Sequence, residues 1–176
     1  MRRLKIFDEI SPDTKKLLKA IIIAKESGEY LLDLILDTEI NPVLLSSFVG
    51  ALGLFGKDNL GKIEEISIKG LDVEMIIIYK YNLIFICILD KMFPKKANIR
   101  KQAEIALDMF YTTYSDLNKT DLCVDTTEFE DFKKILTIQI TKFLTEIEKQ
   151  TEDIPDFGFF TEAIKKMKQL ENSKSL

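Results

Sequence analysis

A glycine-containing segment at residues 56–62 has the spacing of a phosphate-binding loop. Gly56, Gly61 and Lys62 occupy the fixed positions of the pattern GxxxxGK. The eighth residue of a P-loop is Ser or Thr, whose hydroxyl holds magnesium, whereas this chain has Ile63. A P-loop also leads from a strand into a helix N-terminus, and here a predicted helix precedes and a predicted strand follows. We therefore predict a glycine-capped helix-to-strand connection that binds no nucleotide.

Other residue types that support catalysis are either absent from the sequence or lie in polar surroundings. Histidine is absent from the 176 residues, which removes the commonest general base, the usual catalytic triads and most zinc sites. Carboxylate pairs occur at Glu64 with Glu65 and at Asp72 with Glu74. Their polar surroundings predict solvated side chains, because a raised carboxyl pKa requires burial. We expect a protein that is not an enzyme and that holds no cofactor and no metal.

Alternating strands and helices would position these residues. Ser11–Pro12 and Asn41–Pro42 each combine an N-cap residue with proline at the first helical position. The expected strands span residues 20–24, 30–36, 63–69, 72–80 and 83–89, and the expected helices span 12–18, 42–55, 97–114, 127–149 and 159–170.

The hydrophobic pattern of the strands predicts their order in a sheet. The strands at 20–24 and 83–89 are the most uniformly apolar, which indicates burial on both faces and a central place. The strand at 63–69 alternates imperfectly, as an edge strand with one wet face does. The predicted fold class is α/β (α+β), a five-stranded, mostly antiparallel sheet of order 2-1-5-4-3. One helix, at 42–55, would cover one face, and those at 97–114 and 127–149 the other.

Two stretches resemble a known family. Residues 41–57, NPVLLSSFVGALGLFGK, look like the first helix of a longin domain, and residues 63–100 look like its three-strand meander entering the next helix. With the element order, the resemblance to the longin fold covers residues 19–149 and extends to the related roadblock fold and to archaeal longin-like proteins. It implies a longin-like domain at 1–150, with an N-terminal extension at 1–18. A C-terminal helical extension and polar tail at 151–176 depart from a minimal longin.

This resemblance carries expectations about function. Longin and roadblock proteins are typically scaffolds in trafficking complexes and GTPase regulators. The chain is therefore expected to be a non-catalytic protein-interaction module in membrane or vesicle trafficking or in small-GTPase regulation. Its expected partner is a small GTPase or another longin- or roadblock-type subunit. The alternatives are a roadblock-type homodimer that regulates a GTPase and a small-molecule sensor, although a sensor needs polar groups converging in an apolar cavity.

The predicted helix at 42–55 carries no charge on any side. At about 100° per residue, one side collects the large apolar residues and is predicted to face the core: Leu44, Leu45, Phe48, Ala51, Leu52 and Phe55. The opposite side is rich in small residues, which let another backbone approach. Longin and roadblock assemblies commonly use this helix and the neighbouring edge strand for subunit contacts. We predict partner contacts at Val43, Ser46, Ser47, Gly50, Gly53 and Leu54, or else cover by the chain's own residues 159–170 or its N-terminal segment.

The net charge and the cysteines limit the compartment and the partners that can be expected for the chain. A formal net charge of -4 disfavours nucleic acid as a partner. The basic residues near both termini leave peripheral membrane contact open. No apolar run approaches the ~20 residues of a membrane span, and no apolar segment follows the basic start as in a secretory signal. Cys87 lies in an apolar run and Cys123 in a polar connection, so no disulfide is expected and a soluble, cytoplasmic protein is predicted.

Overall fold

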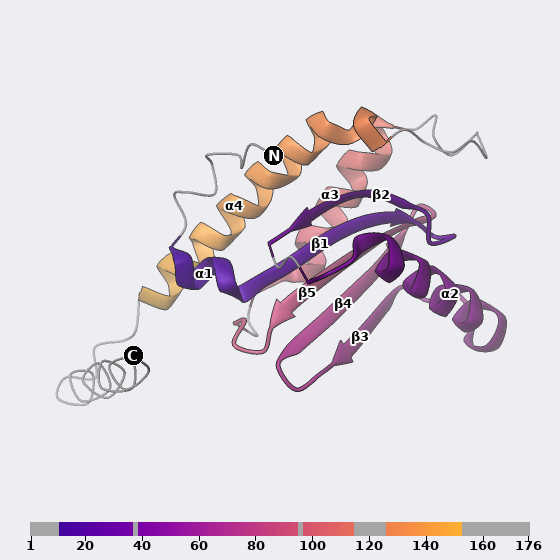
Figure 1. Ribbon diagram of the computed structural model, residues 1–176, viewed down its shortest axis with the longest axis horizontal. Coiled ribbons are helices and arrows are strands. Elements are labelled where there is room, and N and C mark those ends of the chain that lie inside the picture. Colours follow the sequence, from indigo (N-terminus) through magenta and orange to yellow (C-terminus); the bar gives the residue numbers. More distant parts are fainter. Residues whose placement is uncertain (1–10, 37–38, 95–96, 115–125, 153–176) are drawn as a thin grey trace.

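The computed structural model describes residues 11–36, 39–94, 97–114 and 126–152. In this part of the chain a five-stranded antiparallel sheet lies between two layers of helices (Figure 1). The strand order is β2-β1-β5-β4-β3. This confirms the predicted order and fold class.

The elements have the following bounds. The helices are α1 (Pro12–Leu17), α2 (Pro42–Leu60), α3 (Ile99–Thr113) and α4 (Glu130–Glu152), with a 3-10 turn, η3 (Thr126–Phe129), before α4. The strands are β1 (Leu18–Lys25), β2 (Tyr30–Ile35), β3 (Glu65–Lys69), β4 (Val73–Lys80) and β5 (Leu83–Asp90).

Strands β1 and β5 form the middle of the sheet. Residues 83–89 of β5 are all buried, as are residues 20–24 of β1. Ile22 pairs with Ile86 in the antiparallel ladder, and both are fully buried. Burial on both faces explains why β-branched residues fill these two strands without alternation.

Helices α3 and α4 cover one face of the sheet over an aromatic core. The ring of Phe110 lies 5.3 Å from that of Phe129 and 5.1 Å from that of Phe132, between centroids. Along α4, Phe132, Leu136 and Ile140 repeat at the four-residue spacing of one helix face and are buried. The other face carries a smaller cluster under α2: Ile22, Val49, Ile77, Tyr79, Ile84 and Ile86. The predicted distribution of helices over the two faces is therefore confirmed.

The end of α2 differs from the sequence prediction. The helix was expected to stop at Gly56, but it continues to Leu60. Gly61 follows it at φ 93°, a conformation that favours glycine. Gly56 lies within the helix, where its missing side chain makes room for Ile63, whose Cδ1 would lie 1.9 Å from a Cβ placed there. The strand after the helix is correspondingly shorter than predicted and begins at Glu65.

Several predictions concern residues outside the described ranges. The C-terminal extension, including residues 159–170, and Cys123 are among them, as are residues 1–10. Helix α4 continues to Glu152, two residues past the predicted boundary at 150. The division into a domain and an extension stays a prediction.

Candidate protein-interaction surface

Helix α2 begins where the sequence predicted. The side-chain oxygen of Asn41 accepts hydrogen bonds from the backbone N–H groups of Val43 and Leu44, both at 3.1 Å. Pro42 occupies the first turn, where a backbone N–H would have no helical partner. The cap therefore fixes the residue at which the helix begins.

Small residues make up the side of α2 that meets the sheet. The buried residues of the helix are Ser46, Val49, Gly50, Gly53 and Gly56. A Cβ at Gly50 would lie 2.4 Å from the Cα of Gly28 in the β1–β2 turn, where Gly28 has φ 89°. A Cβ at Gly53 would lie 2.9 Å from the ring of Tyr79. The glycines therefore let the helix backbone rest directly on the turn and on the tyrosine ring.

Tyr79 links β4 to the middle of α2. Its hydroxyl donates a hydrogen bond to the backbone oxygen of Val49 at 3.2 Å. Burial, with a smaller contribution from the negative charge of Glu26, raises the pKa of Tyr79 to about 12. The phenol therefore remains protonated and able to donate across the physiological pH range.

The sequence-based assignment of the two sides of α2 is wrong. Leu44, Phe48 and Phe55 were expected in the core, but they are 69%, 56% and 64% exposed. Ala51 is exposed with them, and Leu45 and Leu52 are only partly buried. The helix is turned over because its glycines fit the crowded surface of the sheet, where phenylalanine and leucine side chains would not fit. The larger apolar side chains therefore point to solvent.

The predicted contact residues are divided by this rotation. Val43, Ser47 and Leu54 are exposed and remain available to a partner. The other three, Ser46, Gly50 and Gly53, are buried on the side of α2 that meets the sheet and are not exposed on the surface of this structure. The sequence prediction lacked the contact between Gly50 and Gly28. Glycines in a helix and in a facing turn allow the two backbones to touch, so this side of the helix can face the sheet.

An uncharged apolar stripe results on the outer side of α2. Leu44, Phe48, Ala51 and Phe55 follow one another at intervals of four, three and four residues, so they lie on one helix face. Val43 and Leu54, each 52% exposed, flank them. We call these six residues the α2 apolar face. Sequence reasoning missed its four central members because it read large apolar side chains as core.

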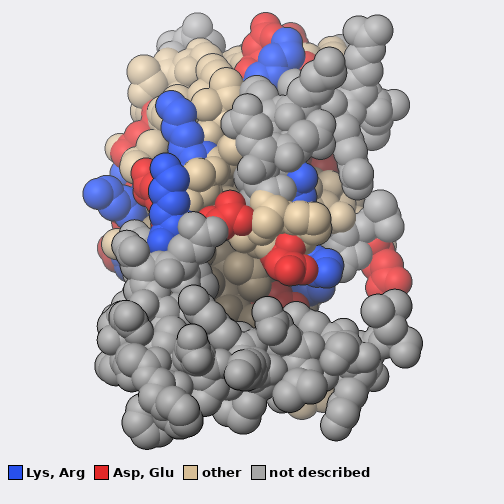
Figure 2. Space-filling view, turned by 90° about the vertical axis from the view of Figure 1, so that its left-hand side faces the viewer, with Lys and Arg blue, Asp and Glu red and all other residues tan. Residues whose placement is uncertain are grey.

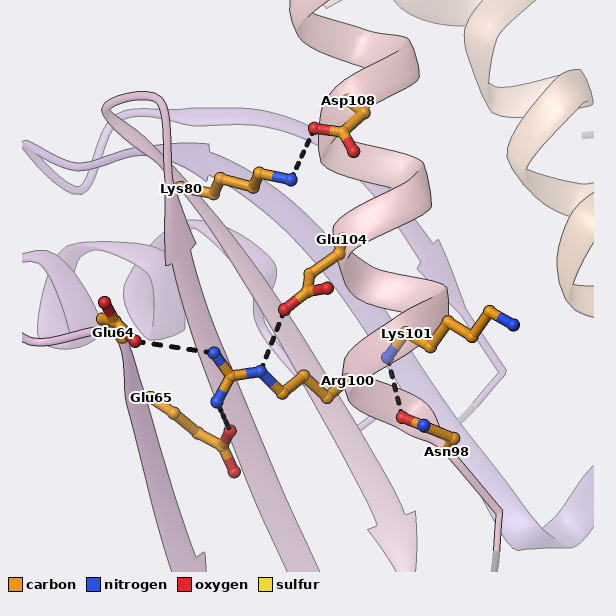
Figure 3. A network of polar contacts seen from close by, with 8 residues as sticks. All are labelled: Glu64, Glu65, Lys80, Asn98, Arg100, Lys101, Glu104 and Asp108. Atoms are coloured by element: carbon orange, nitrogen blue, oxygen red, sulfur yellow. Dashed lines mark hydrogen bonds and ion pairs between the residues drawn. The ribbon is translucent and has the colours of Figure 1, made fainter.

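Ion pairs connect the side chains of α3 to residues in and next to β3 and β4 (Figure 3). The Arg100 guanidinium lies between three carboxylates, 3.6 Å from Glu64, 2.9 Å from Glu65 and 2.9 Å from Glu104. One helical turn beyond Glu104, Asp108 of α3 pairs with Lys80 of β4 at 2.7 Å. The lysine lowers the pKa of Asp108 by stabilising its charged form. Glu64 and Glu65 therefore both bind the side chain of Arg100. Their own side chains are exposed to solvent, as predicted.

The GxxxxGK segment borders a small hollow at the end of α2. The hollow has a volume of about 210 Å³ and is lined by Glu26, Gly53, Lys57, Lys62, Ile63, Tyr79 and Asn82. Its two lysines belong to the segment, but α2 ends there, so the negative end of the helix dipole lies nearby. A phosphate would also meet Glu26. These features, with a volume below the ~300–1,000 Å³ of typical ligand pockets, disfavour a nucleotide site.

Other reactive groups in the described residues lie apart from one another. No group of three or more Cys, Asp or Glu residues within these ranges could hold a metal ion. Cys87 is a free, buried thiol, and burial raises its pKa well above the usual value for cysteine. Asp72 pairs with Lys91 at 3.0 Å on the surface. Among the described residues, the best candidate for a functional site is therefore the α2 apolar face, where exposed apolar side chains lie together without charge.

The left-hand side of the molecule in Figure 1 presents mixed charge. Figure 2 shows acidic and basic side chains close together on the described part of this side. Within the described ranges, no helix combines the length and the apolar character needed to cross a membrane.

Comparisons with known proteins find similarity only in three dimensions. No sequence model of a protein family matches the chain, and no curated protein matches it significantly. The chain is similar in structure to MglB of Myxococcus xanthus, with a TM-score of 0.46 and 15% identity, over 64% of this chain and 99% of that one. It is similar to the gliding protein MglB of Thermus thermophilus, with a TM-score of 0.40 and 11% identity, over 51% and 75%.

A Roadblock/LC7 domain from Streptomyces avermitilis gives a TM-score of 0.43 at 6% identity, over 65% of this chain and 92% of that one. At these identities and TM-scores, the similarities assign neither a family nor an activity to the chain.

Proposed function

We propose that the chain is a non-catalytic protein-interaction module of the longin or roadblock type, which binds its partner on the α2 apolar face. The observation that carries this proposal is the exposure of Leu44, Phe48 and Phe55 on a helix side without charge. Monomeric proteins rarely leave a contiguous apolar patch of this kind in water. The centres of protein interfaces are depleted in charge and enriched in aromatic residues, as this face is.

The proposed partner is a small GTPase or a second subunit of longin or roadblock type. The resemblance of residues 41–57 and 63–100 to longin domains supports this choice. It also supports a role in GTPase regulation or in vesicle trafficking.

The test is a charge placed at the centre of the α2 apolar face. The Phe48→Glu variant should lose binding to small GTPases of the source organism, offered in GDP-bound and GTP-analogue-bound forms, and should lose any self-association. The matched control is Lys142→Glu, which places the same side chain at an exposed position of α4 on the other side of the sheet. Pull-down and sedimentation velocity measure binding, and circular dichroism melting verifies the fold.

The outcomes separate the competing views of this helix. Loss of binding in Phe48→Glu, with a cooperative melt like that of Lys142→Glu, supports the proposal. Binding and assembly unchanged from the wild type would remove the α2 apolar face as an interface. A variant that fails to fold would show that Phe48 belongs to the core, as the sequence pattern first indicated.

A further inference from the structure

The hollow at the end of α2 gathers polar side chains from separate parts of the chain. Its walls come from the β1–β2 turn, the β4–β5 turn, and the last turn of α2 with the residues after it: Glu26, Asn82, Lys57 and Lys62. The two turns are joined, because the backbone N–H of Glu26 donates to the backbone oxygen of Asn82 at 2.7 Å. Residues distant in the sequence therefore line one space of about 210 Å³.

The remaining lining of this hollow is mostly apolar. Tyr79 and Gly53 are buried, and Ile63 is partly buried. A Cβ at Gly53 would lie 2.9 Å from the Tyr79 ring, so the lack of a side chain there keeps the space beside the ring open. The Tyr79 hydroxyl donates its proton to Val49, and its oxygen can still accept a hydrogen bond. The hollow therefore combines an apolar base with charged walls.

The charged side chains on the walls are not neutralised by the protein. Glu26, Lys57 and Lys62 form no ion pair with one another or with any other residue of the described ranges. In the same turn as Glu26, by contrast, Lys25 and Glu29 pair at 2.7 Å. The hollow therefore has two positive charges on the α2 side and one negative charge on the turn side, without a partner for either sign.

These charges match a small ligand that carries both signs. A phosphate or a plain dicarboxylate would meet the carboxylate of Glu26 as well as the lysines. A molecule with two carboxylates and one ammonium would offer a carboxylate to each lysine and the ammonium to Glu26. The side-chain oxygen of Asn82 can accept a further hydrogen bond from that ammonium. The net negative charge of such a ligand offsets the net positive charge of the three side chains.

The α2 terminus has a smaller effect on this ligand than the lysines. The negative end of the helix dipole opposes a carboxylate, but this effect is weak at an exposed helix end and is screened by salt. Lys57 and Lys62 lie at that end. The Asn59 side chain also donates to the backbone oxygen of Phe55 at 2.7 Å, which satisfies one of the last carbonyl groups of the helix.

We propose that this hollow binds an acidic amino acid, L-glutamate or L-aspartate, between α2 and the two turns. A volume below the ~300–1,000 Å³ of pockets for larger ligands suits a molecule of this size. The site gives a role to both lysines of the GxxxxGK segment, which lacks the hydroxyl and the helix N-terminus of a P-loop. It lies on the side of α2 that meets the sheet, so the proposal goes beyond the interaction function of the α2 apolar face and does not depend on it.

An NMR titration of the full chain tests the ligand class. With L-glutamate or L-aspartate, the backbone amide signals of Gly53, Lys57, Lys62 and Asn82 should shift and saturate, while those of α4 should not shift. Glutarate, which lacks the ammonium, and L-glutamine, which lacks the second carboxylate, should each bind about tenfold more weakly than L-glutamate, through the loss of one charge-assisted contact. Added salt should weaken the binding of L-glutamate, because the lysines are exposed.

Three glutamine variants test the roles of the charges. E26Q should weaken L-glutamate binding about tenfold without weakening glutarate, because only the ammonium contact is lost. K57Q and K62Q should each weaken both compounds about tenfold. The matched control is K142Q, the same lysine substitution at an exposed position of α4, which should bind as wild type does. Circular dichroism melting verifies the fold of each variant.

The outcomes decide between this site and its alternatives. Glutarate or L-glutamine binding as tightly as L-glutamate would overturn the proposed ligand class. Saturable binding that E26Q, K57Q and K62Q leave unchanged would place the ligand elsewhere and overturn the site, as would the absence of shifts around the hollow with both acidic amino acids. The Phe48→Glu variant should bind L-glutamate as wild type does. A failure of the ligand proposal therefore leaves the proposed interaction function standing, and loss of partner binding in Phe48→Glu leaves the ligand site standing.

Discussion

The contact between Gly50 and Gly28 decides how closely α2 approaches the sheet. We predict that Gly50→Ala lowers the free energy of unfolding by ~1–3 kcal/mol, the range for overpacking a close contact. Alanine is otherwise the better helix former, so destabilisation would come from the added Cβ, 2.4 Å from the Gly28 Cα. Urea unfolding monitored by circular dichroism measures the effect.

Ser47→Ala is the matched control for this substitution, since Ser47 is exposed on the same helix. It should change the stability by less than ~0.5 kcal/mol, as surface substitutions usually do. If Gly50→Ala were as stable as this control, or more stable, the small side of α2 would not lie against the β1–β2 turn.

Tyr79 gives the protein a specific sensitivity to alkaline pH. Its pKa is raised from 10.0 to about 12 in the fold, so the folded state holds its proton more tightly than the unfolded state. The resulting stabilisation is fully present below pH 10 and is lost as the pH rises through about 12. We predict that Tyr79→Phe removes part of this alkaline loss. At neutral pH the variant should lose ~0.5–1.5 kcal/mol with the hydrogen bond to Val49.

The measurement compares urea unfolding of wild type and Tyr79→Phe at neutral pH and near pH 11. Tyr30 also has a raised pKa, caused by burial and by its hydrogen bond to Asp33, so some alkaline loss remains in the variant. Equal losses of stability in both proteins would mean that the Tyr79 phenol titrates as it does in the unfolded chain.

At the scale of the element, neighbouring residues of α2 should respond in opposite ways. Val49 is fully buried and Phe48 is 56% exposed. We predict that Val49→Ala lowers the free energy of unfolding by about 2 kcal/mol, through the lost methyl groups and the cavity they leave. Phe48→Ala should change stability by less than ~1 kcal/mol but should weaken assembly. Thermal melts and sedimentation velocity on the same samples give both quantities.

The opposite result would favour the sequence-based prediction, in which the large apolar side chains of α2 face the core. If Phe48→Ala lost ~3–5 kcal/mol, the range for truncating a buried aromatic, the large apolar residues of α2 would be core residues in solution. Phe132→Ala on α4, where the ring is 1% exposed, provides the reference for a buried aromatic of this protein.

The elements also show which parts of the structure the sequence could predict. The order of the strands followed from the uniform apolar composition of residues 20–24 and 83–89, because double burial leaves a pattern within each strand. The starts of α1 and α2 followed from Ser11–Pro12 and Asn41–Pro42, which act locally. The rotation of α2 could not be read in this way. It depends on a contact across 22 residues between Gly50 and Gly28, which no periodicity within the helix records.

At the scale of the whole molecule, the two sides of the sheet are unequally covered. The side under α3 and α4 has a large continuous core that includes Phe85, Phe110 and Phe132. The side under α2 has a core of six buried residues, and α2 itself rests on glycines. Much of the apolar surface of α2 therefore faces outward. An association that covers this surface would stabilise the fold as well as recognise a partner.

This coupling predicts a melting temperature that depends on protein concentration. When two folded copies associate and unfolded chains do not, mass action raises the stability as the concentration rises. For a domain of this size, the midpoint should rise by about 2 °C for each tenfold increase in concentration. Differential scanning calorimetry from the micromolar to the submillimolar range measures this shift. The Phe48→Glu variant, which should lose any self-association, should melt at a nearly constant temperature over the same concentrations. A constant midpoint for wild type would argue against a second copy as the stabilising partner, and would favour a different protein on the α2 apolar face.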